Sequence, residues 1–585
     1  MNGGAVDVLA LGRRERVAWA RAVRRYAVPR WMIERATERR LAGDWRGACA
    51  AAGVDVAFDP AEAANRHGTE FAAALEDDLL HLAPDLVRWH LPRGEPTHTT
   101  IAPGQRILLS WPGDSTDAER PLLVVRTPRW AVLGSQRLTL GLDRPADPGR
   151  GRYATHPTID RPHAAFWRGV THAWTTSRHL WDARKAPELR ERIGGNGERA
   201  PFLNPDGTPR AVADPPATDQ GSHDPVAFTE WVVQTYERGD VVEALAAAGV
   251  DARFPMGWLP EGRRGWGDPP LRLPLDPTRI GPETRRLAEA GHEPRFWIPF
   301  DDRTVVRVSL DGTDRVRLRL GSHDSLSPWG VLLPEACWQR SPDLDLLRDG
   351  GASPDELHPL VREALAPGAP DPTGPVGPPE PDPPAPVRIR CQGTWHEMAF
   401  ADGELRDSHG RREDREAAPG DLGEHGAGCL AVREAWSTGR GWLPEPWVAQ
   451  RQGLFQRIQH GDTPGVLRLL DAGLDPRVRD DLGRTPLHLL SRVDHEEVLP
   501  RLLAAGLDVE ARDDEGRTPL FTAVAEYGSW RLVEDLVEAG ARYDVVCAID
   551  GRRSSLPVLI YRMGRTDLLL LSTRIVKEYP ELGRV

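Results

Sequence analysis

Lysine is almost absent from this chain. Lys185 and Lys577 are the only two lysines among 75 basic residues, so arginine carries nearly all of the positive charge. A P-loop requires a Gly-Lys-Ser/Thr sequence, and a protein kinase requires a lysine on a strand near the phosphates. Neither lysine stands in such a context, which excludes both nucleotide-binding classes. The preference for arginine is typical of GC-rich genomes and predicts a bacterial source.

Paired cysteines and long apolar runs are also missing. The five cysteines are odd in number and far apart, and none forms a Cys-x-x-Cys pair. This spacing argues against a zinc ribbon or a disulfide framework. We find no run of about 18 apolar residues and expect no transmembrane helix. Residues 1–10 place no positive charge ahead of their apolar stretch, unlike a secretory signal. A reducing cytoplasm is therefore the expected location.

The charge balance excludes two further classes of partner. The net charge is −12 and the pI about 5.9, which argues against a general binder of nucleic acid or anionic membrane, because both are polyanions. Hydrophobic residues make up 40% and charged residues 28%, as in ordinary soluble globular proteins. A length of 585 residues predicts several domains.

Two proline-rich segments indicate domain boundaries. Residues 367–386 contain ten prolines in twenty positions and should form a stiff spacer without helix or sheet. Residues 203–226 are rich in Pro, Gly and Asp and are expected to form a second connector. The predicted divisions are an α+β unit at 1–202, a linker at 203–226, an α+β unit at 227–366, a proline-rich linker at 367–386, a small β-containing unit at 387–447 and a C-terminal segment at 450–585.

The two α+β units resemble each other. Residues 43–55 and 239–251 both begin with Gly-Asp and continue to Ala-Ala-Ala-Gly-Val-Asp. The Asp suits a helix start and the second Gly a helix stop. Alternating apolar residues follow each copy, as a hairpin at 305–320 with an Asp-Gly turn and a counterpart at 107–125. The fold prediction is multidomain α+β, with duplicated units of antiparallel sheets and helices ahead of an all-α C-terminal array.

The C-terminal segment contains a repeat. Residues 479–488 (RDDLGRTPLH) return as residues 512–521 (RDDEGRTPLF), 33 positions later. A fixed period of this length is typical of stacked helical arrays. The segment resembles the ankyrin repeat family over about residues 450–585. The resemblance implies three to four repeats, the outer ones degenerate, each with a β-turn tip and two antiparallel helices.

The start and end of each expected helix have a local cause. Thr485 and Thr518 can cap the first helices, and the following Pro loses no hydrogen bond at the first helical position. Gly506 and Gly540 suit the ends of the second helices. Phe521 stands where the family usually has His, so one hydrogen bond that braces the turn is in doubt. We expect the short array to pack on the preceding region through Trp436, Trp442 and Trp447.

Ankyrin arrays bind partner proteins through turn tips and first helices, so the resemblance implies a protein partner. The candidate partner-binding residues are Arg479, Asp481, Leu482, Arg492, Arg512, Asp514, Glu515, Glu526, Tyr527 and Trp530. Tyr527 and Trp530 rank first, because aromatic residues often dominate interface energies. The alternative for each residue is a solvated tip without a partner, and for Trp530 simple packing.

The region before residue 445 gives no catalytic, metal or cofactor assignment. The acidic pair Asp301-Asp302 is typical of a surface turn, and Cys391 with His396 does not follow zinc spacing. One face of the hairpin carries a basic stripe of Arg307, Arg315, Arg317 and Arg319. We interpret it as a solvated sheet face rather than a site for a phosphate or an acidic partner.

The predicted function is therefore a protein–protein interaction protein that docks a partner through a C-terminal ankyrin array. The alternative is an enzyme of unknown chemistry before residue 445, with the array as its targeting or regulatory arm. A third hypothesis is a structural scaffold without a dedicated partner. No nucleic acid or membrane partner is expected, and the sequence leaves the oligomeric state open.

Overall fold

The computed structural model of this chain consists of two compact units. The first, called the body, holds residues 1–379 except 133–136, and the second holds residues 380–585 together with 133–136. The structure describes residues 13–93, 99–112, 121–128, 135–143, 171–210, 224–253, 274–299, 304–311, 315–322, 331–380, 383–391, 393–407, 428–549 and 552–584.

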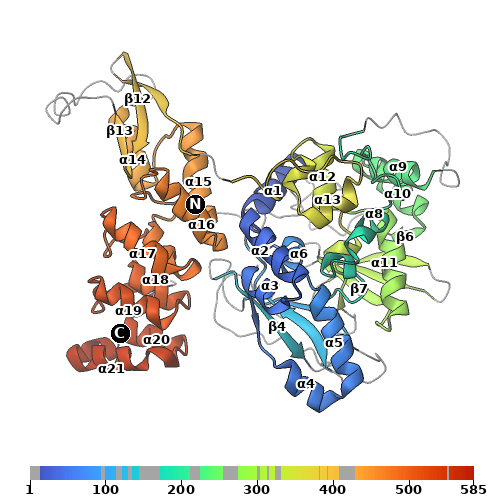
Figure 1. Ribbon diagram of the computed structural model, residues 1–585, viewed down its shortest axis with the longest axis horizontal. Coiled ribbons are helices and arrows are strands. Elements are labelled where there is room, and N and C mark those ends of the chain that lie inside the picture. The colour runs from blue at the N-terminus through green and yellow to red at the C-terminus, as the bar shows by residue number, and fades with distance from the viewer. Residues whose placement is uncertain are drawn as a thin grey trace. The chain divides into compact units, whose positions relative to one another are not determined.

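The body contains helices from both predicted α+β units (Figure 1). Its α-helices are α1 Arg13–Tyr26, α2 Arg30–Leu41, α3 Trp45–Ala51, α4 Pro60–His67, α5 Thr69–His81, α6 Pro84–His90, α8 Leu189–Arg192, α9 Pro225–Arg238, α10 Val241–Ala247, α11 Pro277–Glu289, α12 Pro342–Arg348 and α13 Pro359–Leu365. Its short 3₁₀ helices are η2 Arg178–Leu180, η3 Ala186–Glu188, η6 Glu335–Cys337 and η7 Pro354–Glu356.

One sheet of ten strands runs through the body. Its strands are β1 Val54–Val56, β2 Arg106–Ser110, β3 Leu122–Arg126, β4 Leu138–Asp143, β5 Thr171–Ala173, β6 Val250–Arg253, β7 Arg295–Pro299, β8 Thr304–Leu310, β9 Val316–Ser322 and β10 Val331–Leu332. Their order is β1-β4-β3-β2-β5-β10-β7-β8-β9-β6. Strands from the two predicted units thus join at the pair β5–β10.

The sheet is mixed, which corrects the expectation of antiparallel sheets. The hairpins β2–β3 and β8–β9 are antiparallel and confirm the two predicted hairpins. However, β1 pairs with β4, β6 with β9, and β5 with β2 and β10 in the parallel sense. Parallel pairs need long crossover connections. Helices lie in the connections from β1 to β4, from β6 to β9 and from β5 to β10, whereas the connection from β2 to β5 contains β3 and β4. Hydrophobic alternation alone does not distinguish the two senses.

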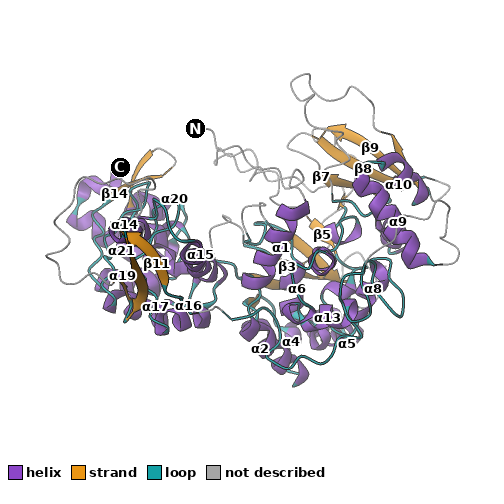
Figure 2. Ribbon diagram, turned by 90° about the horizontal axis from the view of Figure 1, so that it is seen from above, coloured by secondary structure: helices purple, strands orange, loops and turns teal. Residues whose placement is uncertain are grey.

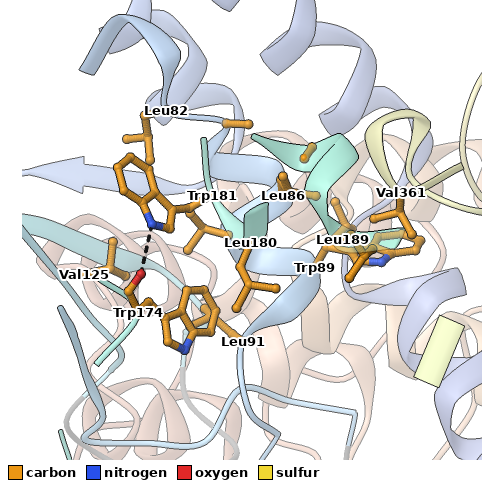
Figure 3. Packing of buried hydrophobic residues seen from close by; sticks show 14 of the residues in the cluster. Leu82, Leu86, Trp89, Leu91, Val125, Trp174, Leu180, Trp181, Leu189 and Val361 are labelled. Atoms are coloured by element: carbon orange, nitrogen blue, oxygen red, sulfur yellow. Dashed lines mark hydrogen bonds between the residues drawn. The ribbon is translucent and has the colours of Figure 1, made fainter. Parts of the chain in front are cut away.

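The helices cover the sheet with apolar faces. Buried residues of α9, α10 and α11 pack on β7, β8 and β9. Figure 2 shows α9 and α10 beside β8 and β9. In the other half, Trp89 and Trp181 are fully buried among leucines (Figure 3). The indole Nε1 of Trp181 donates to the carbonyl of Trp174 at 3.4 Å, so the buried ring keeps a hydrogen bond.

The helices predicted from the Gly-Asp pattern are α3 and α10. The Asp44 carboxylate accepts from the Gly47 backbone N–H at 2.8 Å and caps α3. Gly53 and Gly249, which follow the two helices, have φ values of 66° and 74°, a region that favours glycine. Each helix then leads directly into a short strand, β1 or β6.

The second unit begins with a small sheet and continues as stacked helix pairs (Figure 1). The sheet is antiparallel, with strands β11 Val387–Cys391, β12 Thr394–Ala401 and β13 Glu404–Asp407. The helices are α14 Cys429–Thr438, α15 Glu445–His460, α16 Thr463–Asp471, η9 Pro486–Arg492, α17 His495–Ala504, α18 Pro519–Ala525, α19 Trp530–Glu538, α20 Leu556–Arg562, α21 Leu569–Glu578 and the 3₁₀ turns η10 Thr566–Leu568 and η11 Pro580–Arg584. The hairpin β14 Val546–Ile549 with β15 Arg552–Ser555 precedes α20.

The helix pairs α15/α16, η9/α17, α18/α19 and α20/α21 follow one another along the array. Two helix pairs therefore fill residues 486–538, as the repeat predicted. The first helix of one repeat, η9, is 3₁₀ rather than α.

Residues 387–447, predicted as a separate small unit, share one hydrophobic core with the array. Trp436 and Trp447 are buried in this core and contact Phe400, as expected for a packing role. Trp442 is instead 57% exposed. The proline-rich residues 367–380 and 383–386 carry no helix or strand. Among the described helices, none has the length and apolar character needed to cross a membrane.

Candidate binding groove at the turn tips

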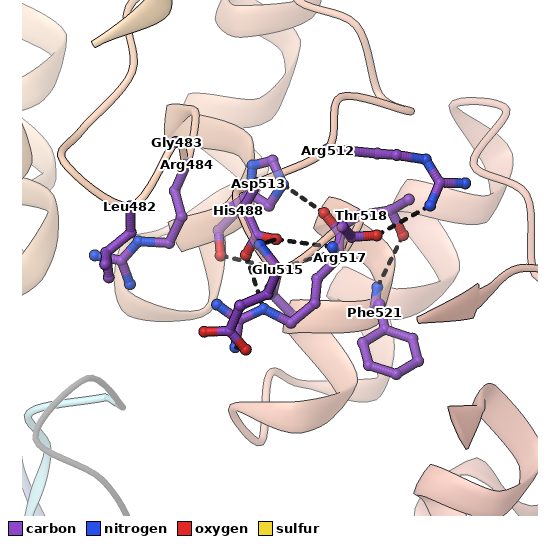
Figure 4. A network of polar contacts seen from close by, with 12 residues as sticks. Leu482, Gly483, Arg484, His488, Arg512, Asp513, Glu515, Arg517, Thr518 and Phe521 are labelled. Atoms are coloured by element: carbon purple, nitrogen blue, oxygen red, sulfur yellow. Dashed lines mark hydrogen bonds and ion pairs between the residues drawn. The ribbon is translucent and has the colours of Figure 1, made fainter. Parts of the chain in front are cut away.

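Each turn tip of the two strongest repeats is held by one aspartate. The Asp480 carboxylate accepts from the backbone N–H groups of Leu482 and Arg484 at 3.0 and 2.8 Å, and from Nε of Arg484 at 2.8 Å. Asp513 makes the same three bonds 33 residues later, at 3.0, 2.8 and 2.7 Å (Figure 4). The first Asp of each Asp-Asp pair therefore braces its turn.

The neighbouring tips are also linked to each other. Arg479 donates to the carbonyl of Gly483 and, at 2.6 Å, to the carbonyl of Arg512 in the next repeat. The backbone N–H of Asp514 donates to the carbonyl of Leu482 at 3.0 Å. These bonds fix the spacing of the tips, so side chains projecting from them are held in a defined arrangement.

His488 braces the first of the two repeats from inside. Its Nδ1 accepts from the backbone N–H of Thr485 at 3.1 Å, and its Nε2 lies 3.1 Å from the carbonyl of Arg517. Burial lowers the pKa of His488 to about 4. Phe521, at the equivalent position of the next repeat, is buried and its ring offers no such bonds, which confirms that one brace is lost.

A groove of about 530 Å³ lies between α14 and these tips. Its lining comes from the α14 region and from the tips of two repeats, and includes Glu434, Arg440, Trp442, Arg479, Gly483 and Asp514. Ala431, Ala435 and Gly441 add small residues to the lining.

The C-terminal end of α14 is tied tightly to the array. Gly439 has a φ of 75°, and a Cβ there would lie 2.6 Å from the carbonyl oxygen of Asp480. Arg451 donates to the carbonyl of Gly439 at 3.1 Å, and Nε1 of Trp436 donates to the carbonyl of Asp475 at 3.1 Å. The wall formed by α14 is therefore fixed relative to the tips.

The groove lining carries two arginines, two acidic residues and one aromatic ring. The Arg440 side chain is 76% exposed and pairs with Asp514 at 2.8 Å. Arg479 also lines the groove, and its guanidinium is held on one side by the two carbonyls. Trp442 contributes an exposed ring. Arginine and tryptophan are the residue types that most often carry binding energy.

The predicted contact residues do not all lie in this groove. Arg479 and Asp514 line it, whereas Asp481, Leu482, Arg512 and Glu515 lie on exposed parts of the neighbouring tips. Tyr527 is 40% exposed, and its hydroxyl donates to the carbonyl of Met563 at 3.0 Å. Trp530 is 50% exposed at the start of α19.

Arg492 and Glu526 form an internal ion pair instead. Arg492 is buried, donates to Gln459 and lies 2.8 Å from the carboxylate of Glu526. It therefore links three successive repeats from within. Sequence reasoning missed Glu434, Arg440 and Trp442, because they precede the repeats and Trp442 was assigned to packing. The available signal was the sequence Gly439-Arg440-Gly441-Trp442, a polar glycine-rich turn that ends in a large aromatic residue.

In the described ranges, no group of three His, Cys, Asp or Glu side chains is placed to hold a metal ion. The family model described as Ankyrin repeats matches residues 454–547 in three copies. No curated protein matches the chain.

Proposed function

We propose that this protein binds a partner protein at the groove between α14 and the turn tips of its ankyrin repeats. Ankyrin repeats are in general protein–protein interaction modules, and residues 454–547 match them. The observation that carries the proposal is the exposed Trp442 beside Arg440 and Arg479, in a groove whose two walls are fixed to each other.

The lining favours an extended segment that carries an acidic side chain. Small residues in the lining let a partner's backbone approach closely, and an aromatic wall contacts an apolar side chain. Arg440 is mostly exposed and bound to an aspartate that is itself 41% exposed, so a partner carboxylate can replace that aspartate at low desolvation cost. The specificity for a carboxylate then follows from the fixed guanidinium of Arg479.

The test uses peptides selected from a random displayed library against the full-length protein. Trp442→Ala is expected to weaken binding at least about 30-fold, the loss of about 2 kcal/mol typical of a hot spot. Trp395→Ala is the matched control, because Trp395 on β12 is also 57% exposed but does not line the groove. Equal binding by wild type and Trp442→Ala would contradict the proposal.

Charge reversal gives a second test at the same groove. Arg440→Glu should reduce binding without changing the melting temperature, because an exposed ion pair contributes little to stability. Arg479→Glu is a poorer choice, since Arg479 also holds two carbonyls that set the tip spacing. Selected peptides that lack acids and bind Arg440→Glu normally would remove the acidic requirement while leaving the groove in place.

We also propose that the body is an internal duplication. Equivalent strands follow in mirrored order on both sides of the β5–β10 pair. Equivalent backbone bonds support it: the N–H groups of Ala83 and Asp276 donate to the carbonyls of Trp181 and Trp338 at 2.8 and 2.7 Å. An experimental structure in which the strands of the two halves are connected in different orders would refute the duplication. The five free thiols are compatible with a cytoplasmic location, which we retain as part of the proposal.

A further inference from the structure

His179 is a buried side chain of the body that has no hydrogen-bond partner among the described residues. It lies in η2, is 1% exposed, and neither ring nitrogen has a hydrogen-bond partner within the described residues. Two other buried histidines of the body differ in this respect. Nε2 of His172 lies 2.9 Å from Oε1 of Gln105, and Nε2 of His358 lies 3.0 Å from Asp85.

His179 is located where the two halves of the sheet meet. β5 and β10 pair in the centre of the sheet in the parallel sense, so their carboxyl ends lie at the same edge. The chain passes from β5 into η2, which carries His179, and from β10 into η6, which carries the buried Cys337. In open sheets with parallel strands, this edge is where ligands commonly bind.

The charged groups that act on His179 are mainly cations. Burial, together with the guanidinium groups of Arg192, Arg279 and Arg286, holds the pKa of His179 well below its usual range. Glu283 neutralises part of this charge, since its carboxylate accepts from Nε of Arg192 at 2.6 Å and from Nη1 of Arg286 at 2.7 Å. Asp276 is also buried and lies close enough to Arg279 to interact with its charge. Because three cations face two carboxylates, the potential at the ring favours an anion.

Arg279 has donor capacity left for such a ligand. It is 4% exposed, and its Nη1 donates to the carbonyl of Gln339 at 2.9 Å. Its Nε has no hydrogen-bond partner in the part of the chain that the structure describes. A buried donor without an acceptor costs about 1–3 kcal/mol, so unpartnered atoms on both His179 and Arg279 call for an acceptor.

We propose that the body binds a small oxyanion, a carboxylate or a phosphate, beside His179 at the junction of the two half-sheets. The anion accepts from the imidazole N–H and from Nε of Arg279. It thereby holds η2 against α11 and stabilises the junction. This site is independent of the groove in the second unit, and either proposal can fail alone.

The test measures the melting temperature and the heat of binding of the full-length protein in sodium phosphate, sodium acetate and sodium chloride at matched ionic strength. A bound anion raises the melting temperature in proportion to the logarithm of its concentration above its Kd. His179→Leu should remove this rise and weaken the measured affinity at least about tenfold. His172→Leu is the matched control: it removes an equally buried histidine that has a partner and should lower stability while keeping the anion response.

Each outcome decides whether the His179 ring contacts an anion, ordered water or neither. A response to phosphate alone or to acetate alone identifies which oxyanion class the site takes. If the wild-type response equals that of His179→Leu in every salt and the variant melts lower, ordered water satisfies the ring and the proposal fails. If the variant melts higher, the ring is dry and the proposal also fails, because an apolar side chain then improves the site. General salt effects act on wild type and variant alike and cancel in the comparison.

Discussion

Replacing Asp480 should destabilise the array far more than replacing its neighbour Asp481. The Asp480 carboxylate accepts two backbone N–H groups and one guanidinium N–H, and its side chain is 14% exposed. The Asp481 side chain is 89% exposed, and its ion pair with Arg451 is 3.4 Å long. The two adjacent aspartates therefore differ in contacts while sharing chemistry and position on the chain.

The expected cost follows from these contacts. Asp480→Ala leaves the buried Arg484 without its partner and removes two charge-assisted bonds to the backbone, which together should cost about 3 kcal/mol. Asp480→Asn keeps an acceptor for the backbone but loses the charge, so about half of that cost is expected. Asp481→Ala should cost less than about 0.5 kcal/mol.

Hydrogen exchange of peptides from residues 480–525 is the suitable assay, because a chain of two units need not unfold in one step. Opening free energies from protected amides in η9 and α18 report the array alone. The expected order of destabilisation is Asp480→Ala, then Asp480→Asn, then Asp481→Ala. If these amides are equally protected in the Asp480→Ala and Asp481→Ala variants, the bracing role assigned to the first aspartate is wrong.

Three further outcomes are expected. The array should lose stability as pH falls from about 6.5 towards 4. In this range His488 is protonated in the unfolded chain but not in the folded chain, where its pKa is about 4. Hydrogen exchange should therefore give opening free energies whose dependence on pH is steeper in wild type than in His488→Phe. Gly439→Ala should lower the melting temperature more than Gly403→Ala, since both glycines have a φ of 75° but only Gly439 would place a Cβ against a carbonyl. Arg565→Ala should destabilise α18 and α20 by about 2 kcal/mol, because Arg565 is buried and donates to the carbonyls of Val524 and Gly528. A smaller loss of unfolding free energy, measured by chemical denaturation, would contradict this.

Local sequence rules predicted those elements whose cause is local. The Thr-Pro starts of η9 and α18, the hairpin β8–β9 and the glycines after α3 and α10 all depend on residues within a few positions. The pairing of β5 with β10 depends on residues far apart in the chain, and three-residue strands carry too little pattern to reveal it. The parallel sense of the outer strands was missed for the same reason.

The candidate contacts show the same division between local and tertiary causes. The repeat period correctly placed Arg479 and Asp514 at turn tips, because the tip positions follow from the motif. It could not separate Asp480 from Asp481 by role, since both are short acids in one turn and only the fold decides which one points at the backbone. Arg492 looked like a surface cation but is buried between Gln459 and Glu526, where burial depends on the neighbouring repeats.

The position of the groove has a physical explanation in how the array is closed at its N-terminal side. A stack of repeats leaves an apolar face at its end, which a capping element must cover. Here Trp436 of α14 packs against Trp447 of α15, the first helix of the stack, and the turn after α14 must then pass the tips at close range, which Gly439 permits. Because Trp442 follows directly after this turn, its ring remains outside the core and beside the tips. Binding residues in this protein are therefore expected in the cap as well as in the repeats.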